Sequence, residues 1–166
     1  LGLDNETDYL GKGLSTCATC DGNFYKGEDV AVVGSGNSAL SEALYLSKLC
    51  RKVYLLHRGV EFKGEKILVD QVKSIPNIEI IDGVKVDKIN ETDGKISSVL
   101  LDNGNTIDVK GVFIYIGYKP DTQIFKDLNV TNINGDILVD EVCATKIEGF
   151  YAIGDCIKKG VYQLVT

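Results

Sequence analysis

The sequence predicts a three-layer α/β fold with a parallel sheet, helices and an antiparallel β-meander. Short apolar runs rich in β-branched residues are typical of buried parallel strands, and amphipathic helical segments alternate with them. A later stretch of alternating apolar and polar residues, divided by Asp-Gly and Asn-Gly turns, indicates hairpins. With 166 residues and 44% hydrophobic content, the chain is long enough for one packed domain and part of another.

A βαβ unit is expected after a polar connecting segment at residues 1–13. The expected elements are a strand over 30–33, a helix over 38–49, a strand over 52–56 and a second helix over 65–75. In the second helix, Leu68, Val72 and Ile75 recur at helical spacing, and Pro76 follows them as a stop signal. Strand, glycine turn, helix and strand in this order predict a right-handed crossover.

Alternating runs from residue 78 onward predict the antiparallel meander. Its expected strands cover 78–81, 84–89, 97–101 and 106–109. Turn signals separate them at Asp82-Gly83, Asp93-Gly94 and Asn103-Gly104. The apolar run at 112–116 is expected to return to the parallel sheet as its closing strand.

The residues after Ile116 are expected to form a linker and an incomplete second unit. Gly117–Asp121 has linker composition; a short helix near Ile124, a turn at 134–136 and a strand at 150–153 follow. These residues are too few for a comfortable domain, and the chain contains no methionine, so we expect a piece of a longer protein. The predicted domains are residues 1–116 and residues 117–166.

Composition excludes several classes of function. The net charge of −6, without clustered Lys and Arg, argues against a nucleic-acid partner. No apolar run approaches the ~18 residues of a membrane helix, so no membrane association is expected. Five cysteines, an odd number with only one close pair, do not form the pattern of a secreted disulfide framework. A cytoplasmic protein is expected.

A glycine-rich turn follows the first apolar run. The six residues that match the pattern G-x-G-x-x-G/A are Gly34, Ser35, Gly36, Asn37, Ser38 and Ala39. The first glycine permits the tight turn, the second lets the backbone approach a pyrophosphate, and the small Ala39 lets helix and strand pack closely. Its place between a strand and a helix favours a Rossmann-like dinucleotide site over an ordinary glycine turn.

The end of the second strand favours NADP over NAD. An acidic residue there would bind the ribose 2′-hydroxyl of NAD, but this sequence has His57 and Arg58 instead, and Lys63 follows. Cations attract a 2′-phosphate. The alternative for Arg58 is an ordinary solvated surface charge.

The pair Cys17 and Cys20 predicts a redox-active dithiol. C-x-x-C spacing allows a disulfide of small ring size, and Asp21 beside it can exchange a proton with a departing thiolate. One alternative is half of a zinc site, another is two structural thiols. No second C-x-x-C pair is present, so no metal site is expected.

Taken together, these motifs resemble the low-molecular-weight thioredoxin reductases of bacteria, in order and spacing over the whole chain. The matching runs are Cys17-Ala-Thr-Cys20-Asp21-Gly22, the glycine turn, His57-Arg58 with Phe62-Lys63-Gly-Glu65-Lys66-Ile-Leu, and Phe150-Tyr-Ala-Ile-Gly154-Asp155.

The resemblance implies that NADPH reduces FAD, FAD reduces the Cys17–Cys20 disulfide, and the dithiol reduces thioredoxin. It implies that Cys20 faces the flavin, that Cys17 attacks thioredoxin and that Asp21 is the acid. It also implies FAD contacts at Gly154, Asp155 and Gln163, and a homodimer in the intact protein.

The chain departs from the resemblance in two respects. The glycine turn expected for FAD is absent, so residues 117–166 are expected to be only the C-terminal part of an FAD domain. Gly59 and Lys63 stand where the family has arginines, which predicts weaker discrimination for the 2′-phosphate. Two alternatives follow: an NADP(H)-binding module without turnover, or a related flavin disulfide reductase with another protein substrate. A ferredoxin-dependent relative would not need the glycine turn.

Overall fold

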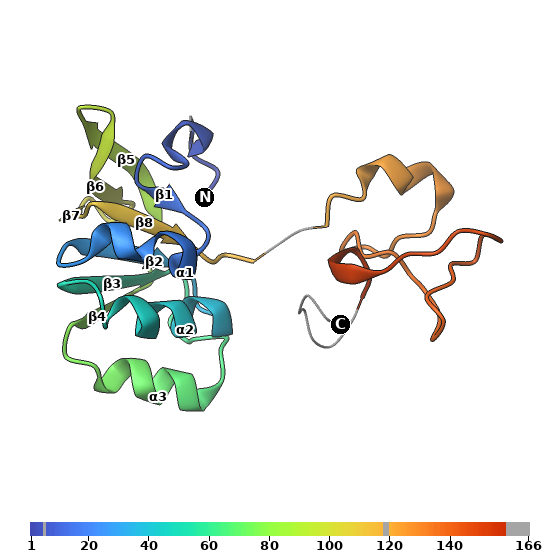
Figure 1. The fold of residues 1–166 in the computed structure, drawn as a ribbon, viewed down its shortest axis with the longest axis horizontal. Coiled ribbons are helices and arrows are strands. Elements are labelled where there is room, and N and C mark those ends of the chain that lie inside the picture. Colours follow the sequence, from blue (N-terminus) through green and yellow to red (C-terminus); the bar gives the residue numbers. More distant parts are fainter. Residues whose placement is uncertain (5, 118–119, 159–166) are drawn as a thin grey trace. The chain divides into compact units, whose positions relative to one another are not determined.

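The structure is a computed structural model that describes residues 1–4, 6–117 and 120–158 (Figure 1). The chain divides into two compact units, Leu1–Gly117 and Tyr118–Thr166. Among the described residues, the first unit contains both sheets and every α-helix.

A parallel sheet forms the centre of the first unit, as predicted, with five strands in place of the three expected at residues 30–33, 52–56 and 112–116. Across the sheet the strands are β1 (Leu14–Ser15), β8 (Gly111–Ile114), β2 (Asp29–Val33), β3 (Lys52–His57) and β4 (Ile78–Asp82). Both faces of this sheet are covered, which is why its central strand is a continuous apolar run. Val30 and Val32 belong to the core on one face, and Ala31 and Val33 belong to the core on the other.

Helices cover one face of the sheet. They are α1 (Ala18–Asp21), α2 (Asn37–Leu46) and α3 (Lys66–Ser74), and Figure 1 shows α2 and α3 together on one side. In α2, Ala39, Leu40, Ala43 and Leu46 are fully buried, because their spacing of three and four residues places them on one stripe. The two longer helices begin and end within three residues of the predicted bounds.

The meander covers the opposite face. It contains β5 (Val86–Thr92), β6 (Lys95–Leu101) and β7 (Thr106–Asp108), paired antiparallel. The prediction that residues 78–81 begin this meander is wrong, because β4 pairs parallel with β3 at the edge of the central sheet. An edge strand is only partly covered, so its apolar and polar residues alternate as they do in a hairpin.

Several further elements lie outside the prediction. The two-residue strand β1 is too short to show any periodicity, and it adds a fifth strand beside β8. Two 3-10 helices, η1 (Glu6–Tyr9) and η2 (Gly22–Tyr25), lie in segments without a helical pattern. The polar segment 1–13 therefore contains one helical turn rather than only a connection.

The second unit has little regular structure in its described part, residues 120–158. It contains the 3-10 helices η3 (Gln123–Leu128) and η4 (Gly154–Cys156) around a small core of Val130, Ile137 and Ala152. The helix predicted near Ile124 is η3. The strand predicted over 150–153 is wrong, because only Tyr151 forms a single bridge, to Ala144. A single isolated bridge, with no paired residues beside it, does not make a strand.

None of the helices in the described ranges has the length and apolar character needed to cross a membrane. Within the same ranges, no group of three His, Cys, Asp or Glu side chains is placed to hold a metal ion.

Candidate functional site

The predicted site residues of the first unit share one edge of the parallel sheet. Cys17 follows the end of β1, Gly34 follows the end of β2, and His57 is the last residue of β3. Parallel strands bring all their carboxyl ends to one side, which is where open α/β sheets bind ligands. The fold therefore places the Cys17–Cys20 pair and the glycine turn at the same edge of the sheet.

Cys17 and Cys20 form a disulfide, with their Cα atoms 5.3 Å apart. Cys17 has extended backbone angles and is the N-cap of α1, and its sulfur accepts a hydrogen bond from the Cys20 amide at 3.2 Å. Cys17 is half-buried and Cys20 is exposed. After reduction, an amide donor at the Cys17 sulfur would favour the thiolate, which is the nucleophilic form.

The Asp21 carboxylate is tied to the strand that leads into the disulfide. The Ser15 hydroxyl donates a hydrogen bond to Asp21 Oδ2 at 2.7 Å and accepts one from the Cys17 amide at 3.0 Å. Ser15 is buried and Asp21 half-buried. Sequence reasoning missed Ser15, whose only signal is a hydroxyl two residues before the first cysteine.

Tyr115, immediately after β8, touches both parts of the site. Its hydroxyl accepts a hydrogen bond from the Ala18 amide at 2.7 Å, at the start of α1. Its backbone carbonyl lies so close to Gly34 that a Cβ atom at Gly34 would collide with it. The packing around Tyr115 therefore fixes α1 and the glycine turn relative to each other.

The glycine turn has the geometry of a phosphate cradle. Gly34 has φ +152° and its amide donates to the Leu56 carbonyl at 2.9 Å, while a Cβ there would also meet Ala39. A Cβ at Gly36 would meet nothing within 4 Å. The first bond of α2 runs from the Leu40 amide to the Gly36 carbonyl, so the preceding amides point out of the helix end. Open space before free amides fits a pyrophosphate.

A loop at residues 62–65 folds over this turn, and sequence reasoning did not foresee the contact. The amides of Lys63 and Gly64 donate to the Ser35 carbonyl at 2.9 and 3.0 Å. The Asn37 side chain accepts from the Glu65 amide at 2.7 Å and donates to the Glu65 carboxylate at 3.0 Å. These bonds hold the backbone of Lys63 next to the turn. The side chains of Asn37 and Lys63 are exposed.

His57 lies inside the protein rather than at its surface. Its side chain is 1% exposed, and its Nε2 is 2.6 Å from the Asp82 carboxylate on β4. Its ring contacts Phe62 at a tilt of 43°, with the centroids 4.3 Å apart. Despite the short distance to Asp82, neither ring nitrogen has a well-aligned hydrogen bond, and both are buried. Arg58 and Lys63 are the exposed members of the predicted cation group.

Gly154 and Asp155, expected at FAD, both lie in η4 of the second unit. Gly154 has φ +80°, which favours glycine, and Asp155 is exposed. Gln163, the third expected FAD residue, lies outside the described residues. The carboxylate of Asp155 is a suitable hydrogen-bond acceptor for a sugar hydroxyl.

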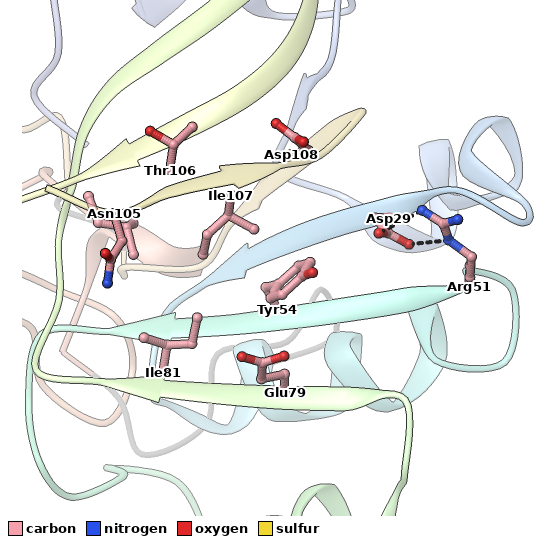
Figure 2. Close-up of a pocket in the computed structure, with 10 residues that line it drawn as sticks. Asp29, Arg51, Tyr54, Glu79, Ile81, Asn105, Thr106, Ile107 and Asp108 are labelled. Carbon is pink, nitrogen blue, oxygen red and sulfur yellow. Dashed lines mark hydrogen bonds and ion pairs between the residues drawn. The ribbon is translucent and has the colours of Figure 1, made fainter.

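A separate hollow of about 520 Å³ lies at the other end of the parallel strands, between the sheet and β7 (Figure 2). Figure 2 shows Asp29, Arg51, Tyr54 and Glu79 along one wall. The Arg51 guanidinium binds Asp29 at 2.7 and 2.8 Å, and Lys52 pairs with Glu79. Because these charges satisfy one another, the hollow presents no set of converging groups that points to a ligand.

Comparisons with known proteins agree with this geometry. The sequence profile of the family "Pyridine nucleotide-disulphide oxidoreductase" matches residues 1–166. Thioredoxin reductases of Buchnera aphidicola subsp. Baizongia pistaciae and Vibrio cholerae are 44% and 40% identical, with all of this chain covered and 55% and 56% of theirs. The structure of Lactococcus lactis thioredoxin reductase has a TM-score of 0.88 at 32% identity, with 100% of this chain and 56% of that one covered.

The chain spans about half the length of the curated relatives it matches. The match to the family profile is complete over the chain, and it agrees with the three-layer fold, the glycine turn and the Cys17–Cys20 disulfide. The chain belongs to the pyridine nucleotide-disulphide oxidoreductase family.

Proposed function

We propose that this chain is the NADPH-binding and disulfide-bearing part of a thioredoxin reductase. The observation that supports the proposal best is the shared edge of the sheet, where the Cys17–Cys20 disulfide follows β1 and the glycine turn follows β2. A dinucleotide site supplies reducing equivalents and a C-x-x-C pair accepts them, and each needs the other for turnover.

The first unit fits the nicotinamide dinucleotide. The open space at Gly36 and the free amides at the start of α2 would hold the pyrophosphate, and Arg58 and Lys63 would hold the 2′-phosphate. Gly154 and Asp155 would contribute to the FAD site, together with Gln163 and with residues that this chain does not contain. Bound NADPH and FAD would supply a hydride and relay its two electrons to the disulfide.

The cysteines perform thiol–disulfide exchange. Two electrons break the Cys17–Cys20 bond, and uptake of two protons gives the dithiol. Cys17 gives its proton to Asp21, and the resulting thiolate attacks the disulfide of thioredoxin to form a mixed disulfide. The departing thioredoxin thiolate then takes that proton from Asp21. Cys20 attacks Cys17 in the mixed disulfide, which releases the second thioredoxin thiol and restores Cys17–Cys20.

The test uses the intact protein, with this chain joined to the remainder that its relatives possess. We expect NADPH to be oxidised in step with reduction of the thioredoxin disulfide, and both to stop in Cys17→Ser and Cys20→Ser variants that still bind NADPH. An intact protein that oxidises NADPH but leaves thioredoxin oxidised would favour the alternative, a flavin disulfide reductase with another protein substrate.

For the chain of 166 residues alone, the second candidate is an NADP(H)-binding module without turnover. Absence of the second glycine turn from the sequence favours it. The purified chain is then expected to be colourless and to bind NADPH, while the intact protein is yellow. A yellow chain would contradict this candidate. We further propose a cytoplasmic, homodimeric flavoprotein for the intact form, which gel filtration with light scattering and cell fractionation would test.

A further inference from the structure

We propose that Glu65 is a positioning residue that holds Lys63 beside the glycine turn, and so strengthens the preference for a nucleotide with a 2′-phosphate. The inference rests on the proposed function, in which Lys63 binds that phosphate. The resemblance contains Glu65 in one of its matching runs but gives it no role. Its contact with Asn37 joins residues 28 positions apart, and it is visible only in the structure.

Glu65 and the Asn37 side chain bind each other through two hydrogen bonds. Asn37 Oδ1 accepts from the Glu65 amide at 2.7 Å, and Asn37 Nδ2 donates to Glu65 Oε1 at 3.0 Å. A side-chain amide has an acceptor end and a donor end, and here one residue binds both ends. The carboxylate thus orients Asn37 so that its oxygen faces the backbone of residue 65. Without that carboxylate, this exposed asparagine is free to rotate away.

Glu65 is also the N-cap of α3, but its carboxylate does not serve that helix. Its carbonyl accepts from the Leu68 and Val69 amides at 3.0 and 3.1 Å, whereas its side chain makes no capping hydrogen bond. N-cap residues are usually Ser, Thr, Asp or Asn, whose short side chains reach the first amides of the helix. The glutamate therefore fits the link to Asn37 better than it fits a capping role.

The loop at residues 62–65 approaches α2 so closely that it requires a glycine. A Cβ atom at Gly64 would lie 3.1 Å from the Asn37 amide nitrogen and would collide with the Leu40 side chain. The amides of Lys63 and Gly64 both donate to the Ser35 carbonyl. The exposed Lys63 side chain therefore extends from a fixed backbone, which lowers the entropy cost of placing its ammonium group on a phosphate.

The negative charge of Glu65 acts against phosphate binding, which makes the sign of the effect informative. The carboxylate lies next to the turn, because it binds Asn37 of the turn, and it repels a phosphate there. If charge alone mattered, Glu65→Gln and Glu65→Ala would both strengthen binding. If the hydrogen bond matters, the two variants differ, because only glutamine keeps an acceptor oxygen.

The first test is titration calorimetry of the full chain with 2′,5′-ADP and 5′-AMP. The preference for the 2′-phosphate is the ratio of the two affinities. We expect it to fall about 3-fold in Glu65→Ala and to stay at or above the wild-type value in Glu65→Gln. The matched control is Glu61→Ala, which removes an exposed carboxylate just before the loop and should not lower the preference. An unchanged or higher preference in Glu65→Ala would overturn the proposal.

A double variant tests whether Glu65 acts through Lys63. Lys63→Ala removes the group that Glu65 positions, so the addition of Glu65→Ala should lower the preference no further. Losses that multiply in the double variant would contradict this route, because they would mean that the two side chains act independently.

Gly64→Ala moves the loop without any change in charge. The added methyl group would push the loop away from α2, so the preference should fall at least as much as in Glu65→Ala. Its matched control is Gly59→Ala, where the new Cβ atom would meet only atoms at 3.4 Å or more. A wild-type preference in Gly64→Ala would show that the position of the loop does not matter.

Hydrogen exchange separates this inference from the proposed function, since it needs no nucleotide. The Lys63 and Gly64 amides should exchange about 3-fold faster in Glu65→Ala than in the wild type or Glu65→Gln. The Gly34 amide, which donates to the Leu56 carbonyl, should keep its rate. Equal rates at Lys63 and Gly64 would overturn the proposal even if nucleotides bind. If the wild type binds neither nucleotide, the proposed function fails, while the exchange rates still decide whether Glu65 holds the loop.

Discussion

At the scale of single residues, the fold decides which of the predicted side chains are exposed to a ligand. The clearest case is the group of cations predicted for the 2′-phosphate. His57 was predicted there because it ends the second strand of the βαβ unit, and the structure does place it at the carboxyl end of β3. However, a sequence does not show which face of a strand end is covered, and Phe62 and Asp82 enclose the ring.

The predicted contact with the 2′-phosphate of NADPH therefore depends on Arg58 and Lys63. Arg58→Ala should weaken binding of NADPH by about 10-fold or more, because a charge-assisted bond to phosphate contributes about 1.5–3 kcal/mol. Lys63→Ala should have a smaller effect, since an ammonium lacks the bidentate geometry of arginine. Titration calorimetry measures the affinity of each variant for 2′,5′-ADP and for 5′-AMP. Lys73→Ala on α3 is the control. Equal losses for both nucleotides would count against a 2′-phosphate contact.

Cys50 predicts a pH effect on stability. Burial, and then the charge of Asp29, raise the pKa of its thiol from 9.0 to about 11. The folded state thus holds this proton more tightly than the unfolded state, so the stabilisation is complete below about pH 9 and is lost as the pH rises towards 11. Urea unfolding should show that the stability difference between the wild type and Cys50→Ala shrinks over this range. Cys156→Ala, at a half-buried position, is the control for removal of a thiol.

At the scale of elements, most of the first unit could be predicted because its strands and helices are long and strongly patterned. The run 30–33 and the spacing of Leu68, Val72 and Ile75 are sufficient for β2 and α3. The partner of a strand is harder to predict: Ile78–Asp82 alternates like a hairpin strand, but pairs parallel with β3. Likewise, β1 is a strand because it pairs with β8. Two residues are too few to show a strand pattern in the sequence.

Tyr115 was not predicted, because its contact with Ala18 joins residues 97 positions apart. Tyr115→Phe should leave the fully buried Ala18 without this partner for its amide, at a cost of about 1–3 kcal/mol. Hydrogen exchange should then become faster at the start of α1, while the central strands keep their protection. Tyr45→Phe on α2 is the matched control, and unchanged exchange at Ala18 in Tyr115→Phe would show that the hydroxyl does not stabilise α1.

At the scale of the whole molecule, the two units differ in how much apolar surface they bury. The first unit has a core on each face of its sheet, whereas the described part of the second has three buried apolar residues and only isolated bridges. We expect amides in residues 120–158 to exchange much faster than those of β2 and β3, because local stability follows burial. Equal protection in both units, measured by exchange mass spectrometry, would contradict this expectation.

The pairing of β1 with β8 has a consequence for protein architecture. The strand that begins the sheet of the first unit is the neighbour of the strand that ends it, with Leu14 opposite Val112. From strand geometry, the chain enters at Leu14 and leaves at Ile114 within roughly 8 Å. A module whose two connections lie side by side can be inserted into a surface loop of a host domain, with little strain on either fold. A block that extends from Leu14 to Tyr115, and so keeps the bond between Tyr115 and Ala18, is therefore suited to transplantation.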